Sequence, residues 1–134
     1  MHEKIIGASL PSSMALAYLG DARHSLFVRE ALVRRGLTKS GDLNREAQRY
    51  VTAEAQARMY RRIEPMLTED ERDTFRRAAN SSHLNRPKHA SLTEYRYATG
   101  FEAVLGMLYF IGDEERLFEI MTEAHKEIDN DTEN

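Results

Sequence analysis

Apolar residues recur at every third or fourth position along most of the chain, whereas no segment alternates strictly between apolar and polar residues. The first pattern is typical of amphipathic helices and the second of strands, so the chain is predicted to be helical throughout. We expect about six helices, at approximately 12–35, 40–51, 52–64, 68–80, 91–110 and 112–128. The sequence therefore predicts an all-α fold.

Local signals mark the ends of several of these helices. Thr68–Glu71 and Ser91–Glu94 each place a hydroxyl residue three positions before a glutamate, which is the capping-box pattern of a helix start. Gly36 is well placed to end the first helix. Residues 80–91, between the last turn of one helix and the start of the next, are polar and long for an ordinary connection, which favours a functional loop.

The length of 134 residues supports one domain, with a core at about 13–128 and a tail at 129–134. The chain has no cysteine, which excludes disulfides, Cys-ligated zinc, iron–sulfur clusters and thiol catalysis, and favours a reducing cytoplasm. The longest apolar run, 103–112, is shorter than the roughly 20 residues of a membrane-spanning helix. We therefore expect no membrane segment, and the N-terminus has no signal-peptide pattern.

The net charge of −3 conceals an uneven distribution of charge. Residues 113–134 carry nine acidic and two basic side chains and are net −7, whereas residues 1–112 are net +4. Fifteen of the nineteen basic residues are arginine, whose guanidinium fork binds phosphate in a bidentate manner. The basic body of the chain fits a nucleic-acid partner, although arginines on solvated helix faces would produce the same counts.

Two carboxylates lie on helix faces that are otherwise apolar. Asp21 has alanine and tyrosine one turn before it, and Glu102 has leucine and glycine one turn after it. Because an unpaired buried carboxylate costs several kcal/mol, each must pair with a base such as Arg23 or Arg96, be protonated, or bind a metal. A hard cation such as Mg²⁺ prefers carboxylate oxygens and water, so two acids on packed helices could anchor one.

Glycines at positions 20, 100 and 106 flank these two acids. A glycine inside a helix costs about 1 kcal/mol relative to alanine. The positions therefore indicate either a close approach between two helices or backbone access to a ligand.

The five histidines have no spacing typical of a zinc site. His24, three residues after Asp21, is predicted to lie at the surface or beside the site rather than in it. His125 belongs to the acidic C-terminal helix. The histidines therefore do not predict a metal centre of their own.

Two segments resemble the signatures of a known family. Residues 16–22, LAYLGDA, resemble the Leu-Gly-Asp-Ala signature of the ribonuclease III family, and residues 95–109, YRYATGFEAVLGMLY, resemble its second signature, Phe-Glu-Ala-aliphatic-aliphatic-Gly. The chain is most similar to the bacterial Mini-III ribonucleases, which consist of the catalytic domain without the double-stranded-RNA-binding domain. The likeness extends over about residues 13–128.

The resemblance implies an RNase III-like endonuclease domain that forms a symmetric homodimer and cleaves double-stranded RNA, with Mg²⁺ as cofactor and Mn²⁺ as its substitute. It assigns Asp21 and Glu102 as catalytic residues that hold the metal. Mini-III proteins are linked to maturation of 23S ribosomal RNA precursors, which implies an rRNA precursor as substrate and a ribosomal protein as a further partner. The candidates for contact with RNA phosphates are Arg76, Arg77, Lys88 and Arg96.

The chain also departs from the family pattern. Met14, Ala17 and Thr99 stand where ordinary ribonuclease III enzymes have acids, and the Mini-III group also lacks these acids. Residues 79–82 read Ala-Asn-Ser-Ser where the Mini-III group usually has Arg-Asn-Ala-Lys. These differences motivate an alternative, a non-catalytic RNA-binding or ribosome-assembly module on the same fold. A helical metal-dependent nucleotide hydrolase is less favoured, because its paired helix acids are matched only by the charged turn at 70–73.

Overall fold

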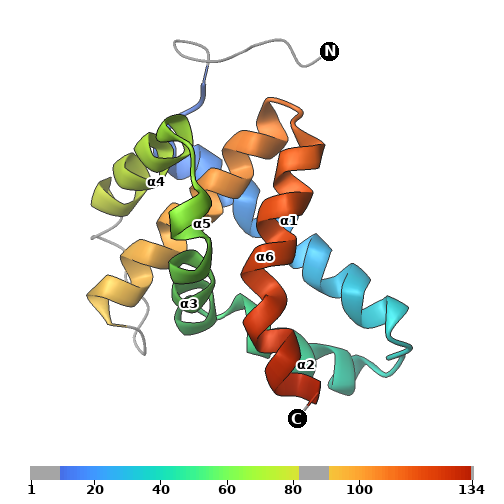
Figure 1. Ribbon diagram of the computed structural model, residues 1–134. Coiled ribbons are helices and arrows are strands. Elements are labelled where there is room, and N and C mark those ends of the chain that lie inside the picture. Colours follow the sequence, from blue (N-terminus) through green and yellow to red (C-terminus); the bar gives the residue numbers. More distant parts are fainter. Residues whose placement is uncertain (1–9, 82–90, 134) are drawn as a thin grey trace.

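The computed structural model describes residues 10–81 and 91–133, with side chains described as far as residue 126. This part of the chain is entirely helical, as predicted, and contains no strand (Figure 1). The elements are α1 (Ser13–Arg34), α2 (Ser40–Val51), α3 (Ala53–Ile63), the 3₁₀ turn η2 (Glu64–Met66), α4 (Glu69–Ser81), α5 (Leu92–Phe110) and α6 (Glu114–Glu133). Within the described ranges, each helix is too short or too polar to span a bilayer.

Side-chain caps begin four of these helices where the sequence predicts them. The hydroxyls of Ser12 and Thr52 accept from backbone N–H groups of α1 and α3, each at 3.2 Å. Thr68–Glu71 forms a reciprocal box at the start of α4, with bonds of 2.8 and 3.2 Å, and Ser91–Glu94 forms a second one at α5. Each cap satisfies backbone donors that no helical carbonyl can reach.

One predicted helix end is confirmed and another differs. Helix α3 ends at Ile63, before Pro65 as the sequence predicts, and Pro65 belongs to the following 3₁₀ turn η2. Helix α6 continues to Glu133 and thus includes residues 129–133, which the sequence suggests as a tail. No glycine or proline occurs after Gly112 to end this helix.

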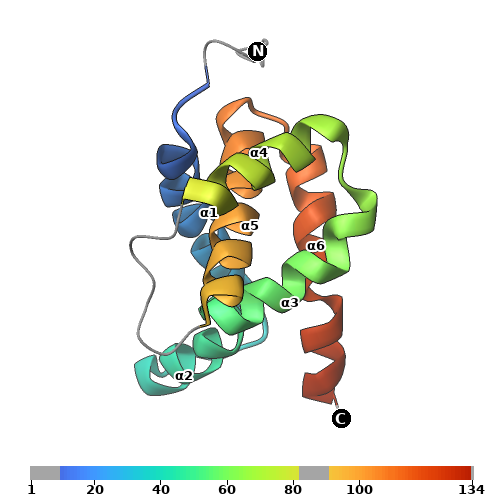
Figure 2. The same cartoon turned by 90° about the vertical axis from the view of Figure 1, so that its left-hand side faces the viewer.

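Helix α5 forms the centre of the molecule. Figure 2 shows it between α1 and α6, with α3 and α4 lying across it. Ten of its residues are buried, and they surround the helix on all sides, from Ala98 to Leu108. A helix that is apolar all round requires partners on every face, and α1 provides the most extensive contact.

The contact between α1 and α5 brings their backbones together at two glycines. A Cβ atom on Gly20 would lie 1.7 Å from the backbone oxygen of Glu102, and one on Gly106 would lie 1.9 Å from the backbone oxygen of Leu16. Neither position can hold a side chain unless one helix moves. The expectation of a close helix–helix approach is therefore confirmed, and it applies to the turn that carries Asp21.

A buried ion pair joins α4 to α6. The Arg116 guanidinium donates to both carboxylate oxygens of Glu71, at 2.9 and 2.8 Å, and to the Met66 backbone oxygen at 2.7 Å. Burial acts to raise the pKa of Glu71, but hydrogen bonds from Arg116 and Thr68 outweigh it and hold that pKa below its usual value. Glu71 is thus an ionised anchor that caps α4 and pairs with α6.

The glycine contact predicts the effect of adding a single methyl group. We expect Gly20→Ala or Gly106→Ala to reduce the free energy of unfolding by about 2 kcal/mol or more, because overpacking against a backbone outweighs the gain of about 1 kcal/mol in helix propensity. Gly41→Ala in α2 is the matched control, since its Cβ would meet nothing within 4 Å. The control should be unchanged or slightly more stable in urea unfolding; equal stability of all three variants would contradict the packing argument.

Candidate active site

The close contact between α1 and α5 places Asp21 beside Glu102. Asp21 follows Gly20, and the Gly20 position faces the backbone of Glu102 itself. The Glu102 side chain is half-buried, and burial together with repulsion from the Asp21 carboxylate raises the pKa of Glu102 to about 9. The structure thus brings together the two acids that the sequence singles out.

The expectation that Asp21 lies on a buried apolar face is wrong. Asp21 is exposed, because the neighbouring side chains Met14 and Tyr18 face solvent and are 40% and 84% exposed. Met14 and Tyr18, on the face of α1 that carries Asp21, therefore do not pack into the core of the single chain. Asp21 instead lies at the surface, where a substrate could reach it.

The basic partners considered for these acids lie elsewhere. Arg23 pairs with Glu114 of α6, at 3.4 Å, and not with Asp21. Among residues 10–81 and 91–126, no lysine, arginine or histidine forms an ion pair with Asp21 or Glu102. When both carboxylates are ionised, they repel each other without a compensating cation among the described side chains.

The donor set of this site fits a hard divalent cation. Two adjacent carboxylates offer oxygen ligands, and a cation between them would offset both the burial and the Asp21 repulsion that raise the Glu102 pKa. The side chains described include no cluster of three or more metal-ligating residues. Water and substrate oxygens would have to complete the coordination of an ion held by Asp21 and Glu102.

A chain of buried polar side chains lies behind Glu102. The Gln56 amide of α3 interacts with the Glu102 carboxyl and favours its ionised form. The Nε2 atom of Gln56 is 3.1 Å from Nδ1 of His24, and Nε2 of His24 is 3.0 Å from Nε2 of His125. All three side chains are almost completely buried, with exposed fractions of 2%, 0% and 5%.

Aromatic rings enclose the two histidines and help to keep them neutral. His24 meets the edge of Phe101 at 5.4 Å, and His125 stacks on Tyr50 at 5.1 Å. Burial, and for His24 also the proximity of His125, lowers the pKa of His24 to about 3, and burial lowers the pKa of His125 to about 4. Both rings are therefore uncharged at neutral pH.

These positions correct the sequence-based interpretation of His24, which was expected near the surface. Its burial follows from its register on α1, because Gly20, His24, Val28 and Leu32 are spaced by four and form one buried stripe. This spacing of four is the sequence pattern that indicates the burial of His24. No comparable signal marks Gln56, which lies between two buried alanines of α3, or its partnership with His24.

The residues predicted to contact RNA are scattered. Arg76 pairs with Asp73 of its own helix, and Arg77 lies on the same helix. Arg96 is half-buried, and its Nε atom has no hydrogen-bond partner within the described part of the chain. Lys88 lies outside the described residues. Their role in RNA binding stays a prediction.

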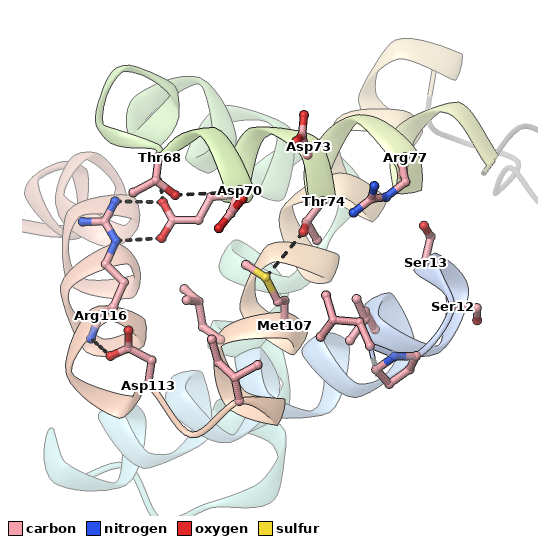
Figure 3. A pocket seen from close by; sticks show the side chains of 16 residues that line it. Ser12, Ser13, Thr68, Asp70, Asp73, Thr74, Arg77, Met107, Asp113 and Arg116 are labelled. Atoms are coloured by element: carbon pink, nitrogen blue, oxygen red, sulfur yellow. Dashed lines mark hydrogen bonds and ion pairs between the residues drawn. The ribbon is translucent and has the colours of Figure 1, made fainter. Parts of the chain in front are cut away.

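A cavity of about 730 Å³ lies apart from the two acids, between the start of α1, α4 and the end of α5 (Figure 3). Its lining includes apolar side chains of Leu16, Met107 and Ile111, and Arg77 and Arg116 at its polar edge. Neither Asp21 nor Glu102 lines it. The cavity is therefore not the candidate active site.

Comparisons with known proteins agree with this arrangement of helices. A model of the ribonuclease III domain matches residues 14–113. The chain is 48% identical to a Mini-ribonuclease 3 of Symbiobacterium thermophilum, over 83% of this chain and 85% of that protein, and 41% identical to a Mini-ribonuclease 3 of Brevibacillus brevis, over 87% of each. A crystal structure of a Fusobacterium nucleatum protein superposes with a TM-score of 0.80 at 30% identity, over 92% of this chain and 98% of that one.

The neutral histidines predict a dependence of stability on pH. Their pKa values are lower in the folded protein than the value of about 6.5 in the unfolded chain, so the unfolded chain binds more protons below pH 6.5. Their contribution to stability is complete above pH 6.5 and is lost as the pH falls toward 4. His125→Gln should reduce the slope of unfolding free energy against pH, between pH 6.5 and 4.5, by up to about 1.4 kcal/mol per pH unit. Parallel curves for variant and wild type would contradict this expectation.

Proposed function

Because this chain belongs to the ribonuclease III family, and to its Mini-ribonuclease 3 group, it is an endoribonuclease, and we propose that it cleaves double-stranded RNA with Mg²⁺ held by Asp21 and Glu102. The observation that carries the metal assignment is the adjacent, uncompensated carboxylate pair. Membership in the family leaves no reason to prefer the non-catalytic alternative. Mn²⁺, which accepts the same oxygen ligands, is the expected substitute.

The site supplies two carboxylates where other ribonuclease III enzymes have more. Ala17 is buried, Met14 faces solvent, and the hydroxyl of Thr99 donates to the backbone oxygen of Tyr95 at 2.9 Å. None of them adds a charged ligand. Asp21 and Glu102 therefore form the whole acidic set at this point of the α1–α5 contact.

The two acids have different tasks in the proposed hydrolysis. Mg²⁺ held by Asp21 and Glu102 would supply an activated water and neutralise charge on the scissile phosphate. We expect the exposed Asp21 to face the RNA, whereas the half-buried Glu102 is hydrogen-bonded to Gln56. The family resemblance implies products with 5′-phosphate and 3′-hydroxyl ends.

The exposed face of α1 supports a homodimer. Tyr18 is 84% exposed and Met14 40% exposed, and both lie on the face of α1 that carries Asp21. A second copy packed on this face would remove the exposed apolar surface of Tyr18 from water. A two-fold dimer built on this face would place two acid pairs near the interface, which suits the two strands of a duplex.

The substrate proposed for the dimer is an rRNA precursor, specifically that of 23S rRNA, in the cytoplasm. The chain has no separate RNA-binding domain within its described helices, and several of its arginines are engaged in ion pairs. Affinity for RNA should consequently be modest and salt-sensitive. A ribosomal protein bound to the precursor would be one way to increase it.

Loss of either acid should abolish metal-dependent cleavage. We expect Asp21→Asn and Glu102→Gln to reduce the single-turnover cleavage rate of duplex RNA in Mg²⁺ by more than about 100-fold, because even groups that only support metal ligands cost 10- to 100-fold. Asp42→Asn, which removes the same charge from α2, is the control and should cleave normally. Cleavage at the wild-type rate by both site variants would disprove the assignment.

A charged residue at position 18 should dissociate the dimer. Tyr18→Glu is expected to shift the mass measured by size-exclusion chromatography with light scattering from two chains to one. Phe118→Glu is the matched control: Phe118 is 63% exposed and lies 6.4 Å from the ring of Phe27, which is nine residues after Tyr18 and therefore on the opposite side of α1. A monomeric wild type, or dissociation by both variants, would refute this interface.

A further inference from the structure

Gln56, His24 and His125 require a function because four helices combine to bury them. They come from α3, α1 and α6, and Glu102 of α5 lies at the end of the row. A buried polar group without a partner costs roughly 1–3 kcal/mol in mutational data, so a core usually avoids such groups. Apolar residues would fill this space without the need for matched hydrogen bonds.

If Glu102 is a metal ligand, the hydrogen bonds of this row can run in only one direction. An ionised carboxylate accepts hydrogen bonds and donates none, so the amide nitrogen of Gln56 must face it. The same nitrogen is 3.1 Å from Nδ1 of His24. Nδ1 of His24 must then be an acceptor, and the proton of that ring must be on Nε2.

The second histidine continues the same direction. Nε2 of His24 is 3.0 Å from Nε2 of His125, and two unprotonated nitrogens would repel at that distance. His24 therefore donates and His125 accepts, which places the His125 proton on Nδ1. Since both rings are uncharged, each has one proton, and the choice made at Glu102 determines both tautomers.

We propose that His125 and His24 fix the orientation of the Gln56 amide, and that Gln56 is a positioning residue that holds the Glu102 carboxylate in the geometry that binds the metal. This inference rests on the proposed function, because it takes Glu102 as a ligand. Rotation of the amide by 180° would bring its oxygen to the same place, against the carboxylate and against the acceptor nitrogen of His24. Gln56 thus holds the Glu102 carboxylate on its buried side, while Asp21 lies at the surface.

Histidine tautomers measured by NMR test the direction of the chain without reference to activity. Long-range ¹H–¹⁵N correlation spectra of the wild-type protein at neutral pH with saturating Mg²⁺, which holds Glu102 in its ionised form, should show His24 protonated at Nε2 and His125 protonated at Nδ1. The opposite tautomers, or a charged ring, in the presence of Mg²⁺ would overturn the proposal. The measurement needs no variant and so does not depend on whether one folds.

Metal affinity tests the effect on Glu102. Gln56→Met keeps the shape of the side chain but removes both donors, and it should weaken binding of Mn²⁺, measured by calorimetry, about 10- to 100-fold. Gln48→Met, at an exposed position of α2, is the matched control and should bind as wild type does. Equal affinity of Gln56→Met and wild type would overturn the role of Gln56 and leave the metal site intact. Absence of Mn²⁺ binding by the wild type would overturn the metal site itself, and this proposal with it.

Discussion

The structure depends on the absence of two side chains where α1 crosses α5. At Gly20 and Gly106 the backbones are so close that a methyl group on either helix would overlap a carbonyl oxygen of the other. Helix α5 is apolar on all sides and supports the other helices, so its separation from α1 sets the spacing of the core. Each of the two glycines is about 1 kcal/mol less favourable in a helix than alanine, and this contact requires both of them.

The same contact explains how two like charges come to be neighbours. Asp21 is covalently next to Gly20, and Glu102 is the residue whose backbone meets Gly20. The crossing therefore brings the two turns that carry these acids together, despite the repulsion between the carboxylates when both are ionised. Burial, together with the nearby Asp21 carboxylate, raises the pKa of Glu102, and packing elsewhere in the core supplies the free energy that keeps the two acids in place. The site is preorganised for a cation because the backbone contact between α1 and α5 brings the two acids together before a cation binds.

The sequence was sufficient for the parts of this structure that depend on local interactions. Helix starts at Thr68 and Ser91 were predictable because a capping box lies within four residues, and Gly20 and Gly106 already indicated a close approach of helices. Asp21 and Glu102 were identified by their unusual surroundings and by two family signatures. The exposure of Asp21 was not predictable, because the apolar residues around it face outward from the single chain and the periodicity of a helix does not distinguish a core from an interface.

The polar chain behind Glu102 shows a different limit. His24 and His125 are 101 residues apart, and their rings meet only because α6 packs near α1 and α3. A pattern within one helix can place His24 on a buried stripe, but it cannot say which polar group will satisfy it. Once the helices are assembled, two buried neutral rings and an amide allow few arrangements of protons, and the acceptor at one end selects among them. The ionisation of the Glu102 carboxylate and the protonation of the two buried histidines are therefore coupled. The coupling exists only once the fold has brought these groups together.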